Sequence, residues 1–167
     1  MTGIKGIVMH WTAGGAKAST LDKQHYHYMV QQDGQIIPGA CKPEDNISTS
    51  DGKYAAHTLN ANTGRIGVAL CGMMGAVERP FQPGTAPIIW SQIEVFCGLV
   101  ADLCVRYSIP VTRLAVLSHA EVQPSLLIKQ RGKWDISWVP GMVSVGSPID
   151  VGDRLRRMIL DHMKGGA

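Results

Sequence analysis

Short apolar runs along the first 120 residues predict the strands of a sheet. Runs rich in Ile, Val, Leu and Ala that end at polar or glycine-containing segments are typical of buried strands. Such runs occupy residues 4–10, 65–72 and 114–118. Two further strand-like runs, residues 27–32 and 35–40, flank Asp33-Gly34. A dipeptide of this type between two strands predicts a β-hairpin.

Two longer segments have the period of an amphipathic helix. Apolar side chains recur on one side of residues 88–107, and Pro110 follows as a helix stop. In residues 150–163 an apolar face opposes a charged face that includes Arg154, Arg156 and Arg157. A short helix is predicted at residues 21–24, and loops are predicted at residues 12–19, 41–62, 73–87 and 121–145.

The alternation of strands and helices, with one embedded hairpin, predicts the fold class. It favours an α/β fold whose mixed central sheet of about five strands is flanked by helices. The 167 residues fit a single domain over residues 1–167, with the helix at 150–163 packed on it or appended to it. Hydrophobic residues make up 45% and charged residues 17%, which is typical of a globular chain.

Charge and cysteine usage narrow the possible partners and compartments. The net charge is +3 and no Lys/Arg run occurs, so nucleic acid is not an expected partner. The four cysteines form no CxxC pair, which favours free buried thiols and synthesis in a reducing compartment. Neither a signal peptide nor an apolar stretch of membrane-spanning length is recognisable. We therefore expect synthesis in the cytoplasm without a signal peptide and no transmembrane segment.

Two histidines follow predicted buried strands, where open α/β sheets place ligand sites. His10 ends the strand at 4–10, and His119 follows the strand at 114–118. If these strands are neighbours, both imidazoles point into one cleft. A catalytic zinc needs three protein ligands, and the Asp135 carboxylate is a suitable third. Spacing alone leaves three competing histidines: His25, His27 and His57.

Four runs of sequence resemble a known family. They are IVMHWTAGG, HYHYMVQQDGQII, AAHTLNANTGRIGVALCG and LSHAEVQ followed by GKWD. In this order, over about residues 4–139, they resemble the type-2 N-acetylmuramoyl-L-alanine amidases, which include phage endolysins, bacterial amidases and peptidoglycan recognition proteins. The resemblance implies the mixed α/β fold of that family and a zinc site of two histidines with an aspartate or cysteine.

Carried over by position, the resemblance assigns roles to individual residues. It implies His10, His119 and Asp135 as zinc ligands. Lys133 matches a lysine that stabilises the tetrahedral intermediate, and Tyr26 matches a tyrosine next to the metal. The family often has Pro-Gly directly after the third ligand, whereas here Pro140-Gly141 comes later.

Three further residues are candidates for substrate binding. His57 matches a polar position that lines the substrate groove in some family members. Arg65 stands where the family often has serine, and arginine suits bidentate binding of a stem-peptide carboxylate. Trp134 is a candidate for stacking on sugar faces, although Trp134 and Trp138 are equally compatible with the core.

The expected function is zinc-dependent hydrolysis of the amide bond between N-acetylmuramic acid and L-alanine in peptidoglycan. The expected setting is a monomeric phage or prophage endolysin that reaches the cell wall after release and lyses the host. Three alternatives stay open: a cytoplasmic amidase that recycles muropeptides, a non-catalytic peptidoglycan-recognition module, and a regulatory partner of a host protein. Recognition modules generally lack one metal ligand, whereas all three candidates are present here.

Overall fold

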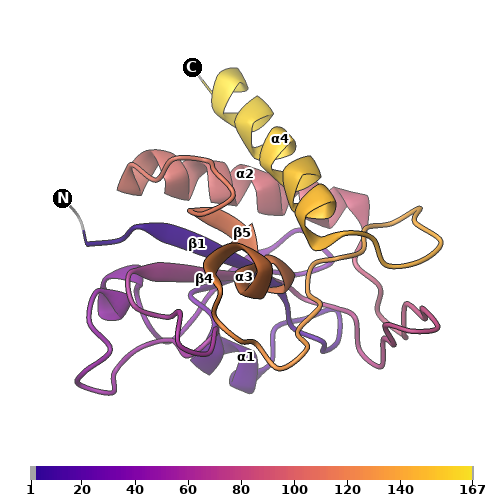
Figure 1. Cartoon of the computed structure of the whole chain (residues 1–167), viewed down its shortest axis with the longest axis horizontal. Coiled ribbons are helices and arrows are strands. Elements are labelled where there is room, and N and C mark those ends of the chain that lie inside the picture. The colour runs from indigo at the N-terminus through magenta and orange to yellow at the C-terminus, as the bar shows by residue number, and fades with distance from the viewer. Residues whose placement is uncertain (1–2, 167) are drawn as a thin grey trace.

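The computed structural model describes residues 3–166, and a five-stranded sheet forms its centre (Figure 1). The strands are β1 (Gly6–Trp11), β2 (Tyr28–Val30), β3 (Ile36–Pro38), β4 (Arg65–Leu70) and β5 (Val116–Ser118). Their order is β3-β2-β4-β1-β5, and all neighbouring pairs are parallel except the hairpin of β2 and β3. The predicted mixed sheet of about five strands is therefore confirmed. The expected domain of residues 1–167 includes residues 1, 2 and 167, which lie outside the described residues.

Helices cover the sheet on two sides. They are α1 (Thr20–His25), α2 (Trp90–Tyr107), α3 (His119–Leu126), α4 (Pro148–Gly165) and a 3-10 turn, η1 (Pro43–Asn46). In Figure 1, α2 and α4 lie above the sheet and α1 lies below it. No helix within residues 3–166 combines the length and apolar character needed to cross a bilayer.

Helix α3 contradicts the prediction that residues 121–145 are irregular throughout. The helix could not be recognised from the sequence because it has only 8 residues and contains Pro124, which removes one backbone donor. The helix begins at His119, and the Glu121 carboxylate reaches back to accept the Ser118 N–H at 2.7 Å. This bond closes the first turn, because a carboxylate is favourable near unsatisfied backbone donors.

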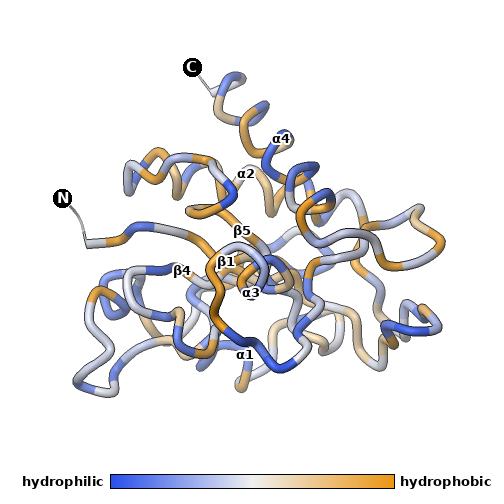
Figure 2. Tube along the Cα trace, viewed as in Figure 1, coloured by the Kyte–Doolittle hydropathy of each residue, from blue (hydrophilic) through white to orange (hydrophobic). Residues whose placement is uncertain are grey.

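Alternation along β1 decides which side chains reach the core and which face away from it. Ile7, Met9 and Trp11 belong to the main core cluster, together with the buried face of α2. Val8 and His10 point to the opposite face, where Val8 joins a smaller apolar cluster. Figure 2 shows the hydrophobic stretches concentrated along the central strands. One strand thus anchors the core and carries His10 on its other face.

Helix α4 packs against α2 and has one charged residue inside the protein. Its apolar face buries Val151, Leu155 and Ile159. Arg156 is only 5% exposed, so the expectation that all three arginines lie on a solvent-facing side is wrong for this residue. The guanidinium binds the buried Glu121 carboxylate of α3 at 2.7 Å. A buried ion pair therefore joins α4 to the helix that begins at His119.

The cysteines are unpaired, as expected from their spacing. Cys71, Cys97 and Cys104 are buried, and Cys41 is partly exposed. Burial raises the pKa of each of the three buried thiols to about 12. These thiols are therefore protonated at neutral pH and act as small apolar core groups.

Candidate metal centre and groove

Strand register brings the two candidate histidines together. β1 and β5 are parallel neighbours, with Met9 opposite Ser118. The next residues along the two chains, His10 and His119, are therefore adjacent at the carboxyl ends of the strands. Their ring centroids are 4.7 Å apart. The sequence predicted that the two imidazoles share a cleft if their strands are neighbours, and the strands are neighbours.

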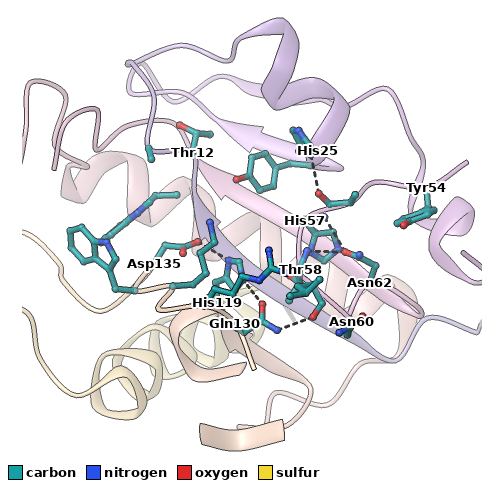
Figure 3. A pocket seen from close by; sticks show the side chains of 18 of the residues that line it. Thr12, His25, Tyr54, His57, Thr58, Asn60, Asn62, His119, Gln130 and Asp135 are labelled. Carbon is teal, nitrogen blue, oxygen red and sulfur yellow. Dashed lines mark hydrogen bonds and ion pairs between the residues drawn. The ribbon is translucent and has the colours of Figure 1, made fainter. Parts of the chain in front are cut away.

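Asp135 reaches the same point from a distant loop. Its backbone carbonyl accepts the Ala120 N–H at 2.6 Å, which fixes the loop against the first turn of α3. The carboxylate Oδ2 lies 3.1 Å from His10 Nδ1 and 3.4 Å from His119 Nδ1. One donor atom from each residue lies within 4.8 Å of the other two, and all three residues are buried. Figure 3 labels two of them, His119 and Asp135.

The protonation states of His10 and Asp135 suit metal binding. Burial lowers the pKa of His10 to about 4, despite the opposing effect of the nearby Asp135 carboxylate. Burial alone would raise the pKa of Asp135, but its close contacts with His10 and His119 hold it at about 2. At neutral pH the site thus offers a neutral imidazole and a carboxylate, and metal ligands must be deprotonated.

The donor set fits zinc, and two of the three competing histidines, His25 and His27, are engaged elsewhere. Two imidazole nitrogens and one carboxylate oxygen, with a position left for water, form a known type of catalytic zinc site. His25 ends α1, contrary to the expected strand alternation with His27, and its Nδ1 lies 2.9 Å from the Ala56 carbonyl. His27 accepts the Gly67 N–H at Nδ1 and contacts Asn46 through Nε2.

A groove of about 980 Å³ lies over this cluster. Its lining comes mainly from residues 54–63 and 130–135, and His119 and Asp135 are both part of it (Figure 3). Tyr26, His57, Lys133 and Trp134 also line the groove. Arg65 is not one of the described residues that line the groove. Its side chain is half-buried at the start of β4.

The aromatic candidates divide into groove and core residues. The Tyr26 ring lies 5.1 Å from the His10 ring. Burial, and then the charge of Asp135, raise the pKa of Tyr26 well above 10, so its hydroxyl remains a hydrogen-bond donor. Trp134 packs edge-on against Trp11 and stays partly exposed in the groove. Trp138 is buried and stacks on Phe81, which makes it a core residue.

Several residues of the site were missed from the sequence. Gln130 is buried beside His119, and Thr58 lies beside His10. Asn60 and Asn62 line the groove. Each belongs to a segment predicted as loop, and no local pattern distinguishes these polar residues from ordinary loop residues. Their positions depend on contacts between segments far apart in the sequence.

The mixed sheet and the cluster of possible metal ligands are those expected of a type-2 amidase fold, and a family model agrees. The model for N-acetylmuramoyl-L-alanine amidase matches residues 1–140. The chain therefore belongs to the N-acetylmuramoyl-L-alanine amidase family. No curated protein sequence matches it.

Solved structures show the same fold at low sequence identity. A mutant of PlyL matches with a TM-score of 0.55 and 20% identity, over 96% of this chain and 85% of that chain. The Ph2119 endolysin from a Thermus scotoductus bacteriophage matches with a TM-score of 0.51 and 19% identity, over 84% and 82%. The amidase AmiD from E. coli, in complex with anhydro-N-acetylmuramic acid-L-Ala-D-gamma-Glu-L-Lys, matches with a TM-score of 0.51 and 23% identity. That match covers 71% of this chain and 49% of AmiD, so the chain spans about half the length of that protein.

Proposed function

We propose that this protein hydrolyses the amide bond between N-acetylmuramic acid and L-alanine of peptidoglycan, with zinc bound by His10, His119 and Asp135. One observation carries the proposal: three buried donor atoms converge within 4.8 Å of one another beside an open groove. Membership of the amidase family gives the bond that is cut. The recognition-module alternative has no comparable support, because all three candidate metal ligands are present.

The residues around the cluster suit amide hydrolysis. When bound, zinc lowers the pKa of a bound water to about 7 and polarises a carbonyl oxygen. The Lys133 side chain is exposed in the groove, where its ammonium group would stabilise negative charge that develops on the substrate carbonyl oxygen. Tyr26, protonated at neutral pH, would donate a hydrogen bond that orients the carbonyl or the attacking water.

The groove suits a glycopeptide substrate. Asn60, Asn62 and Thr63 offer amide and hydroxyl groups to the peptide backbone and sugar hydroxyls. Trp134 offers an apolar ring face for a sugar. His57 also lines the groove and is included as a substrate contact. The proposal does not extend to Arg65, which lies outside the groove lining.

For the biological setting, we propose a monomeric phage or prophage endolysin that acts on the cell wall after release. The Ph2119 endolysin shares the fold over most of both chains, which supports this setting. A muropeptide-recycling amidase would use the same chemistry on soluble fragments. Comparing hydrolysis of intact sacculi with hydrolysis of soluble muropeptides separates the two settings, and light scattering on the purified protein tests the monomer.

Digestion of purified peptidoglycan tests the activity itself. We expect stem peptides with a free L-alanine amino terminus, detected by mass spectrometry. A chelator should abolish their release and added zinc should restore it. In the proposed mechanism the activation of water and the polarisation of the carbonyl depend on bound zinc. Binding to peptidoglycan without any new amino termini would overturn the amidase proposal and favour a recognition module.

Replacing Lys133 with alanine should slow hydrolysis without loss of the metal. We expect kcat to fall by about 10²–10³-fold, the usual effect of removing one group that stabilises an oxyanion. Zinc content should be unchanged, because Lys133 is exposed in the groove and lies outside the cluster of donor atoms. Lys129, an exposed lysine in the same segment, provides the matched control Lys129→Ala, which should retain full activity. Equal activity of both variants would remove Lys133 from the mechanism.

A further inference from the structure

The two histidines of the metal cluster each have a second ring nitrogen that faces away from it. Both rings direct Nδ1 toward Asp135. The Nε2 atom of His119 lies 2.8 Å from Gln130 Oε1, and that of His10 lies 3.2 Å from His57 Nδ1. Neither Gln130 nor His57 belongs to the group of residues that could hold the metal. Both are buried.

The orientation of the Gln130 amide determines which nitrogen of His119 has the proton. Gln130 Nε2 donates to the Leu59 carbonyl at 2.8 Å, so Oε1 must be the atom that faces His119. An amide oxygen can only accept, and His119 Nε2 must therefore be the donor. In a neutral imidazole the other nitrogen, Nδ1, then has the lone pair that a metal needs.

The same logic applies to His10 through a second intermediate. His57 Nε2 donates to the Arg65 carbonyl at 3.3 Å, which leaves Nδ1 as an acceptor facing His10 Nε2. Thr58 Oγ1 lies 2.8 Å from His57 Nδ1 and 3.3 Å from His10 Nε2, so its hydroxyl donates to His57 and its oxygen is a further acceptor for the His10 Nε2 proton. The His57 ring lies directly over Gly67, where an added Cβ would stand 2.5 Å from His57 Cγ. The absence of a side chain at Gly67 therefore permits this position of the ring.

We propose that Gln130 and His57 are positioning residues that hold both histidines in the tautomer with Nδ1 free to bind the metal. Two backbone carbonyls, those of Leu59 and Arg65, fix the direction of the two chains of hydrogen bonds. The inference rests on the proposed zinc site and assigns a task to residues outside it. It also gives His57 a structural task behind His10, in addition to its place in the groove lining.

Substitution of Gln130 tests the proposal by metal affinity. Gln130→Met removes the acceptor at similar volume, and we expect the zinc affinity to fall by about 10–100-fold, the usual effect of losing such a partner. Gln130→Glu restores an acceptor and should recover most of that loss. The matched control is Gln92→Met, because Gln92 is a buried glutamine whose side chain bonds the carbonyls of Val30 and Cys71 and the Ile89 N–H, none of which belongs to the metal cluster. Affinities are measured by competition with a chromophoric chelator, well below the unfolding temperature of each variant.

A second readout follows the proton directly in the zinc-loaded protein. The Nε2 proton of His119 should appear in the nitrogen-edited spectrum of the wild type and of Gln130→Glu, and be lost to solvent exchange in Gln130→Met. His57→Phe should weaken zinc binding independently, through His10. Equal zinc affinity in Gln130→Met and Gln92→Met would overturn the positioning role while leaving the zinc site intact. A wild-type protein that binds no zinc would instead overturn the proposed metal centre itself.

Discussion

Replacing Asp135 with alanine is expected to weaken zinc binding by more than 100-fold and to abolish amide hydrolysis. The carboxylate supplies the negative charge of the three-residue cluster and approaches both histidines. Loss of a ligand should therefore exceed the 10–100-fold effect typical of losing a partner behind a ligand. The loop itself should stay in place, because its contact with Ala120 uses the backbone carbonyl of Asp135. Zinc competition and the peptidoglycan digest measure the two effects.

The identity of the replacement makes this prediction specific. Asp135→Cys should recover zinc binding, because a thiolate is an established zinc ligand, whereas Asp135→Asn lacks the charge and should recover little. Asp161→Ala, at an exposed carboxylate on α4, is the control for a general loss of negative charge and should bind zinc normally. Full zinc occupancy in Asp135→Ala would mean that another group supplies the third donor.

The strands and long helices were predictable because their patterns are local. Apolar runs identified β1, β4 and β5, and the Asp33-Gly34 turn identified the hairpin. Helix α3 could not be identified in this way, because it is short, contains Pro124 and depends on the Glu121 carboxylate at its first turn. The burial of Arg156 could not be predicted either, because a charged helix residue is buried in the protein interior only when a partner of opposite charge, distant in the sequence, lies beside it.

The site was predictable to different depths for different residues. His10 and His119 could be predicted as site residues because each stands at the carboxyl end of a strand. The carboxyl ends of parallel neighbouring strands lie at the same edge of the sheet. Asp135 was a candidate from its carboxylate chemistry, and the family resemblance singled it out, since the position of a loop residue cannot be predicted from local sequence alone. Gln130 and its bond to the Leu59 carbonyl join segments 71 residues apart in the sequence, and no local pattern encodes that contact.

A buried ion pair joins the C-terminal helix α4 to α3, the helix that begins at His119. The family model ends at residue 140, before α4 begins at Pro148. Arg156 nevertheless contacts both carboxylate oxygens of Glu121, at 2.7 and 3.1 Å, and donates to the Val116 carbonyl of β5. Glu121 is fully buried, and a Cβ at Gly152 would collide with its carboxylate. We propose from this that one domain extends through α4.

Arg156→Met should therefore destabilise the whole domain. The substitution leaves the Glu121 carboxylate buried without its cation, and breaking such a pair costs about 3–5 kcal/mol. Urea unfolding should show this loss as one cooperative transition, because α4 would not melt separately. Arg157→Met, at an exposed position on the same helix, is the control and should change the free energy of unfolding by no more than about 0.5 kcal/mol.

The double variant Glu121→Met with Arg156→Met distinguishes the effect of the two charges from the effect of side-chain packing. It replaces both charges with apolar groups. It should regain much of the stability lost in Arg156→Met, because the unpaired charge causes most of that loss. The first turn of α3, which begins at His119, would still lack the Glu121 oxygen that accepts the Ser118 N–H. Zinc affinity should therefore recover less than stability does. Recovery of both to the same extent would show that α4 supports the fold without contributing to the placement of His119.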